Sequence, residues 1–311
     1  MLSQAQRPAL PPIVETLYPF TTRQLQVGEE RMSFAEVGSA DAPPLLFVHG
    51  NLTWSFLFRE AIKTCAEKFH VIAPDHVGFG LSSKPAQAAY HTLEQHIANL
   101  VALVEALHLE RITLVLHEWG GPIGLGFATR FPEKVQRIVL LNTFALPIPA
   151  DLKPSWQLRL LNTSVGSVAP RALLSSALRS LSASSLPEDV LNAYQLPLAE
   201  PNGLVAPLAF ARMLPMNAGD ANARTLDEIA SNLKSVTARV EMVWGKRDPI
   251  LGSPLTAYML RDAFPNSAEP RWPEHTGHLV PEDAPIEVTD ALLAPFRPKP
   301  KPAKPLLNIL K

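Results

Sequence analysis

Leu114-Val115-Leu116-His117-Glu118-Trp119-Gly120-Gly121-Pro122-Ile123-Gly124 is the stretch on which the fold depends. Its first part continues an apolar run that begins at Ile112, and such a run is typical of a strand buried on both faces of a parallel sheet. The glycines and Pro122 predict a helix that begins immediately afterwards and packs closely on this strand. An abrupt break from strand to helix holds the turn residue, Glu118, at the carboxyl edge of the sheet.

This arrangement is the geometry of a nucleophile elbow, in which a sharp strand-to-helix turn exposes a reactive side chain. Esterases and lipases carry serine at the elbow, whereas this chain has the carboxylate of Glu118. A carboxylate attacks best at an sp³ carbon that bears a leaving group, and the alkyl-enzyme ester that forms is then hydrolysed by activated water. The elbow therefore favours nucleophilic substitution, and it disfavours an esterase.

Strands and helices alternate along the chain on both sides of the elbow. The sequence predicts an antiparallel pair over residues 24–38, buried strands over 45–48, 71–73, 137–141 and 240–244, a short strand near 270–272, and helices over 254–264 and 286–296. Thr92 is expected to cap another helix, with Gln95 as its capping-box partner. The alternation predicts an α/β protein with a doubly wound, mostly parallel sheet.

Between residues 146 and 235 the pattern changes to short helices rich in Leu, Ala and Ser, which prolines interrupt. Because this stretch follows one core strand and precedes the next, we expect an inserted helical cap over the carboxyl edge of the sheet, where ligands of open α/β sheets bind. The predicted core then comprises residues 1–145 and 236–296. Residues 297–311 form a basic, proline-rich tail that is expected to be disordered.

The bulk composition narrows the class of protein. The chain has 311 residues, 47% hydrophobic and 18% charged, which suits one catalytic domain with an inserted subdomain. A net charge of −1 gives no reason to expect nucleic acid or a membrane as a partner. Cys65 is alone, so an intramolecular disulfide is excluded. With no signal peptide and no run of about 18 apolar residues, the expected location is cytoplasmic, and the oligomeric state stays open.

Three candidate catalytic residues are expected to meet at one edge of the sheet. Glu118 lies on the elbow, Asp248 follows the strand at 240–244, and His278 lies in the last core loop. The order nucleophile, acid, histidine is that of the α/β-hydrolase fold. A histidine held by Asp248 can act as a general base towards water, so no metal or cofactor is needed.

Two further residues are candidates for binding the leaving anion or an oxyanion. Asn51 offers a side-chain amide directly after His49-Gly50, and Trp119 offers an indole N–H beside the elbow. Both can point at one anion in front of Glu118, where donors gain strength as negative charge develops. The alternatives are that Asn51 bonds its own loop and that Trp119 only fills the core.

Some residues near the site are expected to support it without reacting. Phe210, Met213 and Leu214 are expected to line an apolar pocket for a small hydrophobic substrate, although an internal cap core would give the same pattern. The neighbouring histidines are assigned to support or packing: His49, His76, His117 and His275.

The motifs together resemble those of haloalkane dehalogenases. The similar segments are residues 49–59, 73–85, 117–121, 244–248 and 277–278, within a resemblance that spans roughly residues 30–295 and is weakest in the cap. The resemblance implies that Asn51 and Trp119 are the halide-binding pair. The acid at Asp248, with Asn142-Thr143 at the other acid position, is similar to the subgroup that includes β-lactone decarboxylases.

Two positions depart from the family pattern. The family nucleophile is Asp, and Glu118 is one methylene longer, which moves the carboxylate by about 1 Å; a misplacement of that order can cost about 100-fold in rate. The family motif usually has Pro where this chain has Leu52. Glu118 can reach by a folded rotamer, meet a substrate that sits further out, or form a static ion pair with His278 that leaves the site inactive. The sequence leaves these three open.

The leading hypothesis is a cofactor-free hydrolase of carbon–halogen bonds, or of a related strained electrophile such as a β-lactone. An epoxide hydrolase uses the same triad but normally needs cap tyrosines, and the predicted cap contains only Tyr194. The hypothesis of another class is a catalytically impaired α/β-hydrolase-fold protein that binds a hydrophobic ligand.

Overall fold

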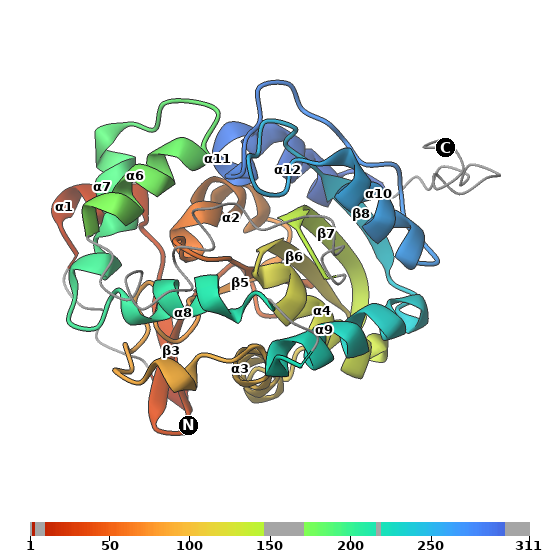
Figure 1. Cartoon of the computed structure of the whole chain (residues 1–311), viewed down its shortest axis with the longest axis horizontal. Helices are drawn as coiled ribbons and strands as arrows, with labels where there is room; N and C mark the ends of the chain where they lie inside the picture. The colour runs from red at the N-terminus through yellow and green to blue at the C-terminus, as the bar shows by residue number, and fades with distance from the viewer. Residues whose placement is uncertain (1, 4–9, 146–170, 216–218, 296–311) are drawn as a thin grey trace.

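The centre of the protein is one twisted sheet. The computed structural model describes residues 2–3, 10–145, 171–215 and 219–295, and within these residues the sheet has eight strands in the order β1-β2-β3-β5-β4-β6-β7-β8 (Figure 1). The strands are β1 (Leu2–Ser3), β2 (Thr22–Val27), β3 (Glu30–Val37), β4 (Pro44–Val48), β5 (His70–Pro74), β6 (Ile112–Glu118), β7 (Val135–Thr143) and β8 (Arg239–Val243). β1 to β3 pair antiparallel, as does β3 with β5, and the remaining pairs are parallel. The predicted doubly wound, mostly parallel sheet is confirmed.

The apolar run of β6 is buried on both faces of the sheet. Leu114 pairs with Leu46 of β4 on one side and with Ile138 of β7 on the other. Successive side chains of a strand point to opposite faces, so Leu114 and Leu116 belong to one hydrophobic core and Val115 to the other. Both faces therefore need helices to cover them.

Helices cover the two faces of the sheet. They are α1 (Pro12–Leu17), α2 (Arg59–Cys65), α3 (Leu93–Ala106), α4 (Gly120–Arg130), α6 (Arg171–Leu181), α7 (Glu188–Gln195), α8 (Val205–Met213), α9 (Ala221–Asn232), α10 (Pro254–Ala263), α11 (Val280–Asp283) and α12 (Pro285–Leu293), with 3₁₀ turns η1 (Ser55–Phe58), η2 (Ala88–Tyr90), η3 (Pro132–Lys134), η5 (Pro197–Ala199) and η6 (Leu233–Ser235). Residues of α3, α4 and α10 fill one core, and residues of α2, α11 and α12 fill the other.

The helices between β7 and β8 straddle the sheet, and we call them (α6 to α9) the cap helices. Buried residues of α6 and α7 join the core on the side of α2 and α11, whereas those of α8 and α9 join the core on the side of α3 and α4. Figure 1 shows α6 and α7 on the side of α1 and α11, and α9 on the side of α4. The predicted short helices are confirmed over residues 171–215 and 219–235. The domain boundaries stay a prediction, because residues 146–170 and the tail at 297–311 lie outside the described residues.

Two local expectations need correction. The hydroxyl of Thr92 accepts a hydrogen bond from the backbone N–H of Gln95 (3.1 Å), but the Gln95 side chain donates to Asn99 (2.9 Å), one turn further along α3. Thr92 therefore caps the helix without a reciprocal capping box. Residues 270–272 form only an isolated bridge at Arg271, because the prolines on either side of the Arg271-Trp272 pair have no N–H to extend a strand.

No helix among the described residues is long and apolar enough to cross a lipid bilayer.

Candidate active site

The elbow predicted at Glu118 is a strained turn. Glu118 is the last residue of β6 and has a φ of 51°, a region that costs a residue other than glycine about 1–3 kcal/mol. Helix α4 begins two residues later at Gly120. The hydroxyl of Thr143, at the end of the neighbouring strand β7, donates to the Glu118 carbonyl (2.5 Å). This bond holds the turned peptide, so the elbow is supported from outside its own segment.

The Glu118 carboxylate is bound by two backbone N–H groups. Its Oε2 atom accepts hydrogen bonds from Asn51 N (2.7 Å) and Trp119 N (2.5 Å). The side chain folds over Gly50, where an added Cβ would lie 2.3 Å from Oε2 and 2.4 Å from the Glu118 Cβ. Glycine at this position is therefore required. The longer side chain of Glu118 folds back onto the paired N–H groups. Whether this position lets it reach a substrate stays a prediction.

Two opposing effects act on the acidity of Glu118. Burial raises the pKa of its carboxyl group, and this effect outweighs the charge of His278 and the two N–H bonds, which lower it. Residue Glu118 as a whole is nevertheless only half-buried. In the part of the chain that the structure describes, both hydrogen bonds to the carboxylate end on Oε2, so Oε1 is the oxygen left to react.

His278 and Asp248 form a buried pair. Nδ1 of His278 lies 2.8 Å from Oδ2 of Asp248, and the two side chains are 3% and 0% exposed. Because an ionised carboxylate only accepts, the proton of a neutral His278 ring resides on Nδ1, which leaves Nε2 as the basic nitrogen. Asp248 also accepts from Nδ2 of Asn142 (2.7 Å) and, through Oδ1, from the backbone N–H of Ile250 (2.7 Å).

The pair shifts the acidity of both members. Burial opposes the charged form of Asp248, but the charge of His278 and the hydrogen bonds from His278 and Asn142 outweigh it and hold the pKa of Asp248 at about 2. Burial likewise lowers the pKa of His278, yet the Asp248 charge outweighs it, so that the pKa of His278 is raised. The site therefore combines a firmly ionised acid with a histidine that gains a proton more easily than usual.

Three supporting residues of this pair were outside the predicted catalytic set. Asn142, at the end of β7 with a φ of 29°, also accepts from Gly245 N (2.7 Å) and so ties β7 to the loop that carries Asp248. Ring atom Nε2 of His117 lies 2.8 Å from the His278 carbonyl, in agreement with the supporting role expected for His117. Asp283 binds the backbone beside His278 through Gly277 N (2.8 Å). The sequence signal for Asn142 was its place at a strand end; no comparable signal marked Asp283.

Asn51 and Trp119 each make contacts besides the bonds to Glu118. The Asn51 amide donates to the carbonyl of Pro207 in α8 (3.1 Å), and its oxygen accepts from Leu52 N (2.8 Å). The Trp119 ring is 3% exposed and packs edge-on against Phe144. Each side chain thus has a structural role of its own. Their binding of a halide stays a prediction.

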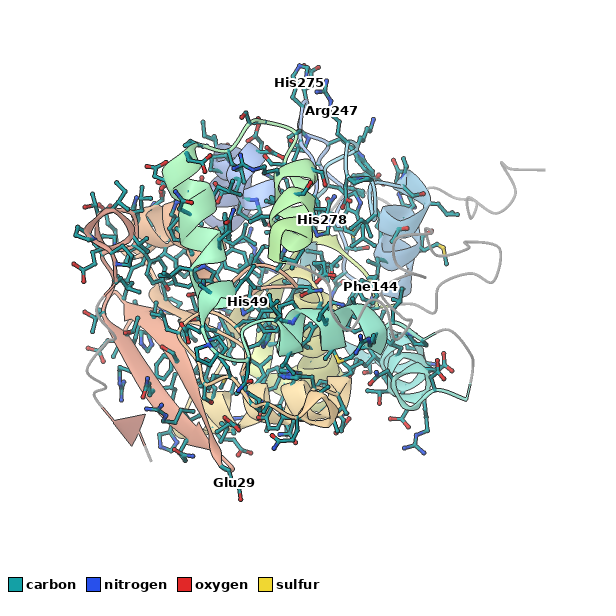
Figure 2. The ribbon with its side chains drawn as sticks, turned by 60° about the vertical axis from the view of Figure 1, so that its left-hand side comes forward. Glu29, His49, Phe144, Arg247, His275 and His278 are labelled. Atoms are coloured by element: carbon teal, nitrogen blue, oxygen red, sulfur yellow. The ribbon has the colours of Figure 1, made fainter. Side chains whose placement is uncertain are left out.

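The other histidines divide into buried and exposed positions. His49 Nε2 accepts from His76 N (2.9 Å), and His76 Nε2 lies 3.0 Å from the His49 carbonyl, which supports the loop that precedes Asn51. His275 is exposed. Figure 2 shows His275 at the outer edge of the molecule beside Arg247, whereas His278 lies inside.

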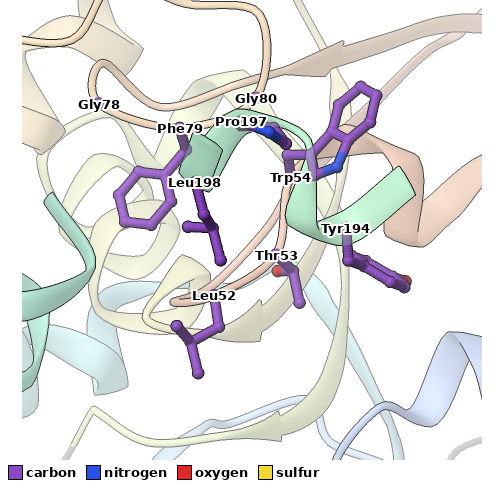
Figure 3. Close-up of a pocket in the computed structure, with 9 residues that line it drawn as sticks. All are labelled: Leu52, Thr53, Trp54, Gly78, Phe79, Gly80, Tyr194, Pro197 and Leu198. Atoms are coloured by element: carbon purple, nitrogen blue, oxygen red, sulfur yellow. The ribbon is translucent and has the colours of Figure 1, made fainter. Parts of the chain in front are cut away.

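An apolar pocket lies beside the Asn51 loop. It is lined by Leu52, Thr53, Trp54, Gly78, Phe79, Gly80, Tyr194, Pro197 and Leu198 (Figure 3). Glu118 and His278 do not line it, and neither do Phe210, Met213 and Leu214. Phe210 is fully buried and packs edge-on against Phe79 and His96. The contacts among the described residues therefore favour the alternative in which Phe210 fills the core.

Comparison with known proteins identifies the family. A family model described as the alpha/beta hydrolase fold matches residues 43–285. Together with the parallel sheet and the strained turn after β6, this match shows that the chain belongs to the alpha/beta hydrolase fold family.

Within this family, the relatives are of two kinds. The chain is 33% identical over 289 residues to a cis-3-alkyl-4-alkyloxetan-2-one decarboxylase of Shewanella oneidensis, covering 89% of this chain and 88% of the relative. It is 28% identical over 291 residues to a haloalkane dehalogenase of Mycolicibacterium paratuberculosis, covering 89% and 93%. The structure of haloalkane dehalogenase DpaA from Paraglaciecola agarilytica NO2 superimposes with a TM-score of 0.79 at 26% identity, covering 90% of this chain and 94% of that one. The predicted resemblance and the hydrolase-type enzyme class are confirmed.

Proposed function

We propose that this protein is a cofactor-free enzyme in which Glu118 attacks an sp³ carbon that bears an oxygen or halogen leaving group. The observation that supports the proposal most directly is the hydrogen bonding of Oε2 to Asn51 N and Trp119 N, with the His278–Asp248 pair acting on the same carboxylate. The two N–H groups fix the carboxylate and leave Oε1 as the attacking atom. An interaction prepared before the reaction costs no reorganisation during it.

The substrate class that we favour is a small, hydrophobic β-lactone, because the more similar relatives are decarboxylases of alkyl-substituted oxetan-2-ones. In this reaction Oε1 bonds to the ring carbon that bears the ring oxygen, and the carbon–oxygen bond breaks to release a carboxylate that stays attached to the substrate. The bond to that carboxylate then breaks, its electrons form a carbon–carbon double bond, and Glu118 departs with its own electron pair. The products are an alkene and carbon dioxide, and no water is consumed.

His278 has a specific role in this scheme. The released carboxylate needs a nearby positive charge, and the raised pKa of His278 makes its imidazolium form more accessible than that of an ordinary histidine. We therefore expect the rate of lactone consumption to be highest below the pKa of His278 and to fall as the pH rises through it.

The second candidate is hydrolysis of carbon–halogen bonds, which the position of Asn51 and Trp119 beside Glu118 supports. Here the carbon–halogen bond breaks, halide leaves, and neutral His278 removes a proton from the water that hydrolyses the Glu118 ester. Since a base must be unprotonated to act, this rate should rise with pH through the same pKa. The opposite slopes of the two pH profiles separate the two reactions.

The first experiment offers cis-3,4-dialkyl β-lactones and a panel of bromoalkanes to the purified protein. Alkene is measured by gas chromatography, and bromide by ion chromatography. Glu118→Gln should abolish turnover, while Glu67→Gln, which changes an exposed glutamate, should leave it unchanged. Turnover that survives in Glu118→Gln would show that another group is the nucleophile.

The second experiment is Glu118→Asp. Removing one methylene withdraws the carboxylate from Asn51 N and Trp119 N by about 1 Å, and we expect kcat to fall about 100-fold. If Asp is instead active and the parent is not, the native protein is a degenerate enzyme. Absence of turnover and of any covalent adduct in both forms would favour the binding-protein hypothesis.

A further inference from the structure

The loop that carries His278 is hydrogen bonded to the end of cap helix α6. The carbonyl of Leu181, the last residue of α6, accepts from His278 N (2.8 Å) and from Leu279 N (3.4 Å). Leu181 itself is 7% exposed and joins the same core as Leu279. The backbone of the candidate catalytic histidine is therefore attached to the cap as well as to the sheet.

Asp283 joins the same two segments from the other side. Its Oδ2 atom accepts from Gly277 N (2.8 Å), next to His278, and from Ala183 N (2.9 Å) in the segment after α6. Its Oδ1 atom accepts from the Ser182 hydroxyl (2.6 Å) and from Ser184 N (3.2 Å). One carboxylate thus receives four donors, three of them from the cap and one from the His278 loop.

The two segments approach each other too closely for a side chain at Gly277. A Cβ there would lie 2.7 Å from the Leu181 carbonyl oxygen, 2.8 Å from Ala183 N and 3.1 Å from Asp283 Oδ2. Backbone atoms cannot move away as the end of a flexible side chain can. The close contact between cap and loop is therefore built into the backbone.

The residue before Asp283 attaches α11 to other elements. Glu282 pairs with Arg59 of α2 (2.9 Å between Nη2 and Oε2) and accepts a hydrogen bond from the Tyr194 hydroxyl of cap helix α7. The Arg59 and Glu282 side chains are 7% and 8% exposed. Because these bonds fix α11, Asp283 is a rigid support against which the peptide before His278 is oriented.

We propose that Asp283 is a positioning residue for His278 and that it couples the cap helix α6 to the orientation of this histidine. The inference rests on the role of His278 in the proposed function. Asn in place of Asp283 presents an NH₂ group to donors on one side of the cluster, so it cannot accept all four bonds. The Gly277–His278 peptide then loses a fixed partner, and His278 loses its alignment with Glu118.

The test compares Asp283→Asn with Asp290→Asn, which changes an exposed aspartate on the adjacent helix α12. The ring signals of His278 are followed by NMR of protein labelled with ¹⁵N-histidine, and amide exchange is measured at Gly277 and His278. Kinetics use a dialkyl β-lactone and 1-bromohexane. With 1-bromohexane, Oε1 of Glu118 displaces bromide and forms an ester, which intact-protein mass spectrometry detects.

We expect Asp283→Asn to shift the His278 ring signals, to speed amide exchange at Gly277, and to lower kcat about 100-fold. With 1-bromohexane KM should fall together with kcat, because only the hydrolysis step is slowed. With 1-bromohexane the ester on Glu118 should accumulate, because only its hydrolysis needs His278. A merely structural role would lower the amount of folded protein without producing this adduct. Ser182→Ala removes a single bond to Asp283 and should give a smaller change in the same direction, and it replaces Asp283→Asn if that variant does not fold.

The inference would be overturned if folded Asp283→Asn had unchanged His278 ring signals and unchanged amide exchange rates. If Asp283→Asn does not fold, the same result in Ser182→Ala would overturn it. Failure of the parent protein to turn over any probe would count against the proposed function, but the NMR and exchange measurements would still decide whether Asp283 positions His278.

Discussion

Replacing Asp248 with asparagine should destabilise the protein and disable His278 at the same time. The pKa of Asp248 is held at about 2, against 3.8 for a free aspartate, which corresponds to about 2 kcal/mol of stabilisation at neutral pH. An asparagine also cannot satisfy its surroundings, because His278 and Asn142 donate at Oδ2 and Ile250 donates at Oδ1. In either orientation its NH₂ group faces a donor, and a buried unsatisfied donor costs about 1–3 kcal/mol.

The expected loss in unfolding free energy is therefore about 3–5 kcal/mol at pH 7, measured by urea denaturation followed by circular dichroism. Because the pKa of Asp248 is lower in the folded state, the ionised side chain stabilises the folded protein above pH 3.8. This stabilisation is lost as the pH falls towards 2. The difference between parent and Asp248→Asn should therefore shrink over that interval. Asp290→Asn, an exposed change, should leave the unfolding free energy within about 0.5 kcal/mol of the parent value.

The same variant should lose activity for an electrostatic reason. Without the Asp248 charge, only the Glu118 charge opposes the effect of burial on His278, so the pKa of His278 should fall below its value in the parent protein, as NMR titration of the ring would show. Removal of the acid of a comparable triad lowers kcat by about 10⁴-fold, and we expect a fall of that order with either substrate class. A variant with the parent's stability and turnover would refute the assignment of Asp248 as the partner of His278.

Three further predictions concern residues around the elbow and the cap. Gly50→Ala should displace the Glu118 side chain, cost about 1–3 kcal/mol in unfolding free energy and abolish turnover; a folded, active variant would show that the folded position of Glu118 is not required. Leu52→Pro should destabilise the protein by more than about 1 kcal/mol, because Leu52 has a φ of 61° that proline cannot adopt, whereas Leu52→Gly should be tolerated; equal stability of the two would contradict this account. Burial lowers the pKa of His76 and of His91 to about 4, so these rings protonate in the unfolded chain before they do in the folded one. The unfolding free energy measured by urea denaturation should therefore fall by about 2 kcal/mol for each of these histidines between pH 6.5 and 5. An unfolding free energy that does not change over this range would refute the burial of the two rings in their neutral form.

The fold was predictable because its signals are local. The apolar run of β6, the break at Glu118 and the alternation of strands and helices all follow from spacing within short windows, and the structure confirms them. The strand expected near Arg271 was wrong, because β-propensity does not supply the backbone donors that its neighbouring prolines lack. The reciprocal cap at Thr92 failed for a similar reason: Gln95 had a second acceptable partner, Asn99, on its own helix.

By itself, the sequence determined which groups stand at the carboxyl edge: a carboxylate on the elbow, then an acid, then a histidine. Only the tertiary structure decided how Glu118 folds onto two backbone N–H groups, and which residues hold the others in place. Asn142 meets Asp248 across 106 residues of chain, and Asn51 meets Pro207 across 156. Such contacts depend on where the sheet brings strand ends and cap helices together. A local sequence pattern does not encode which residues far apart in the chain will meet there.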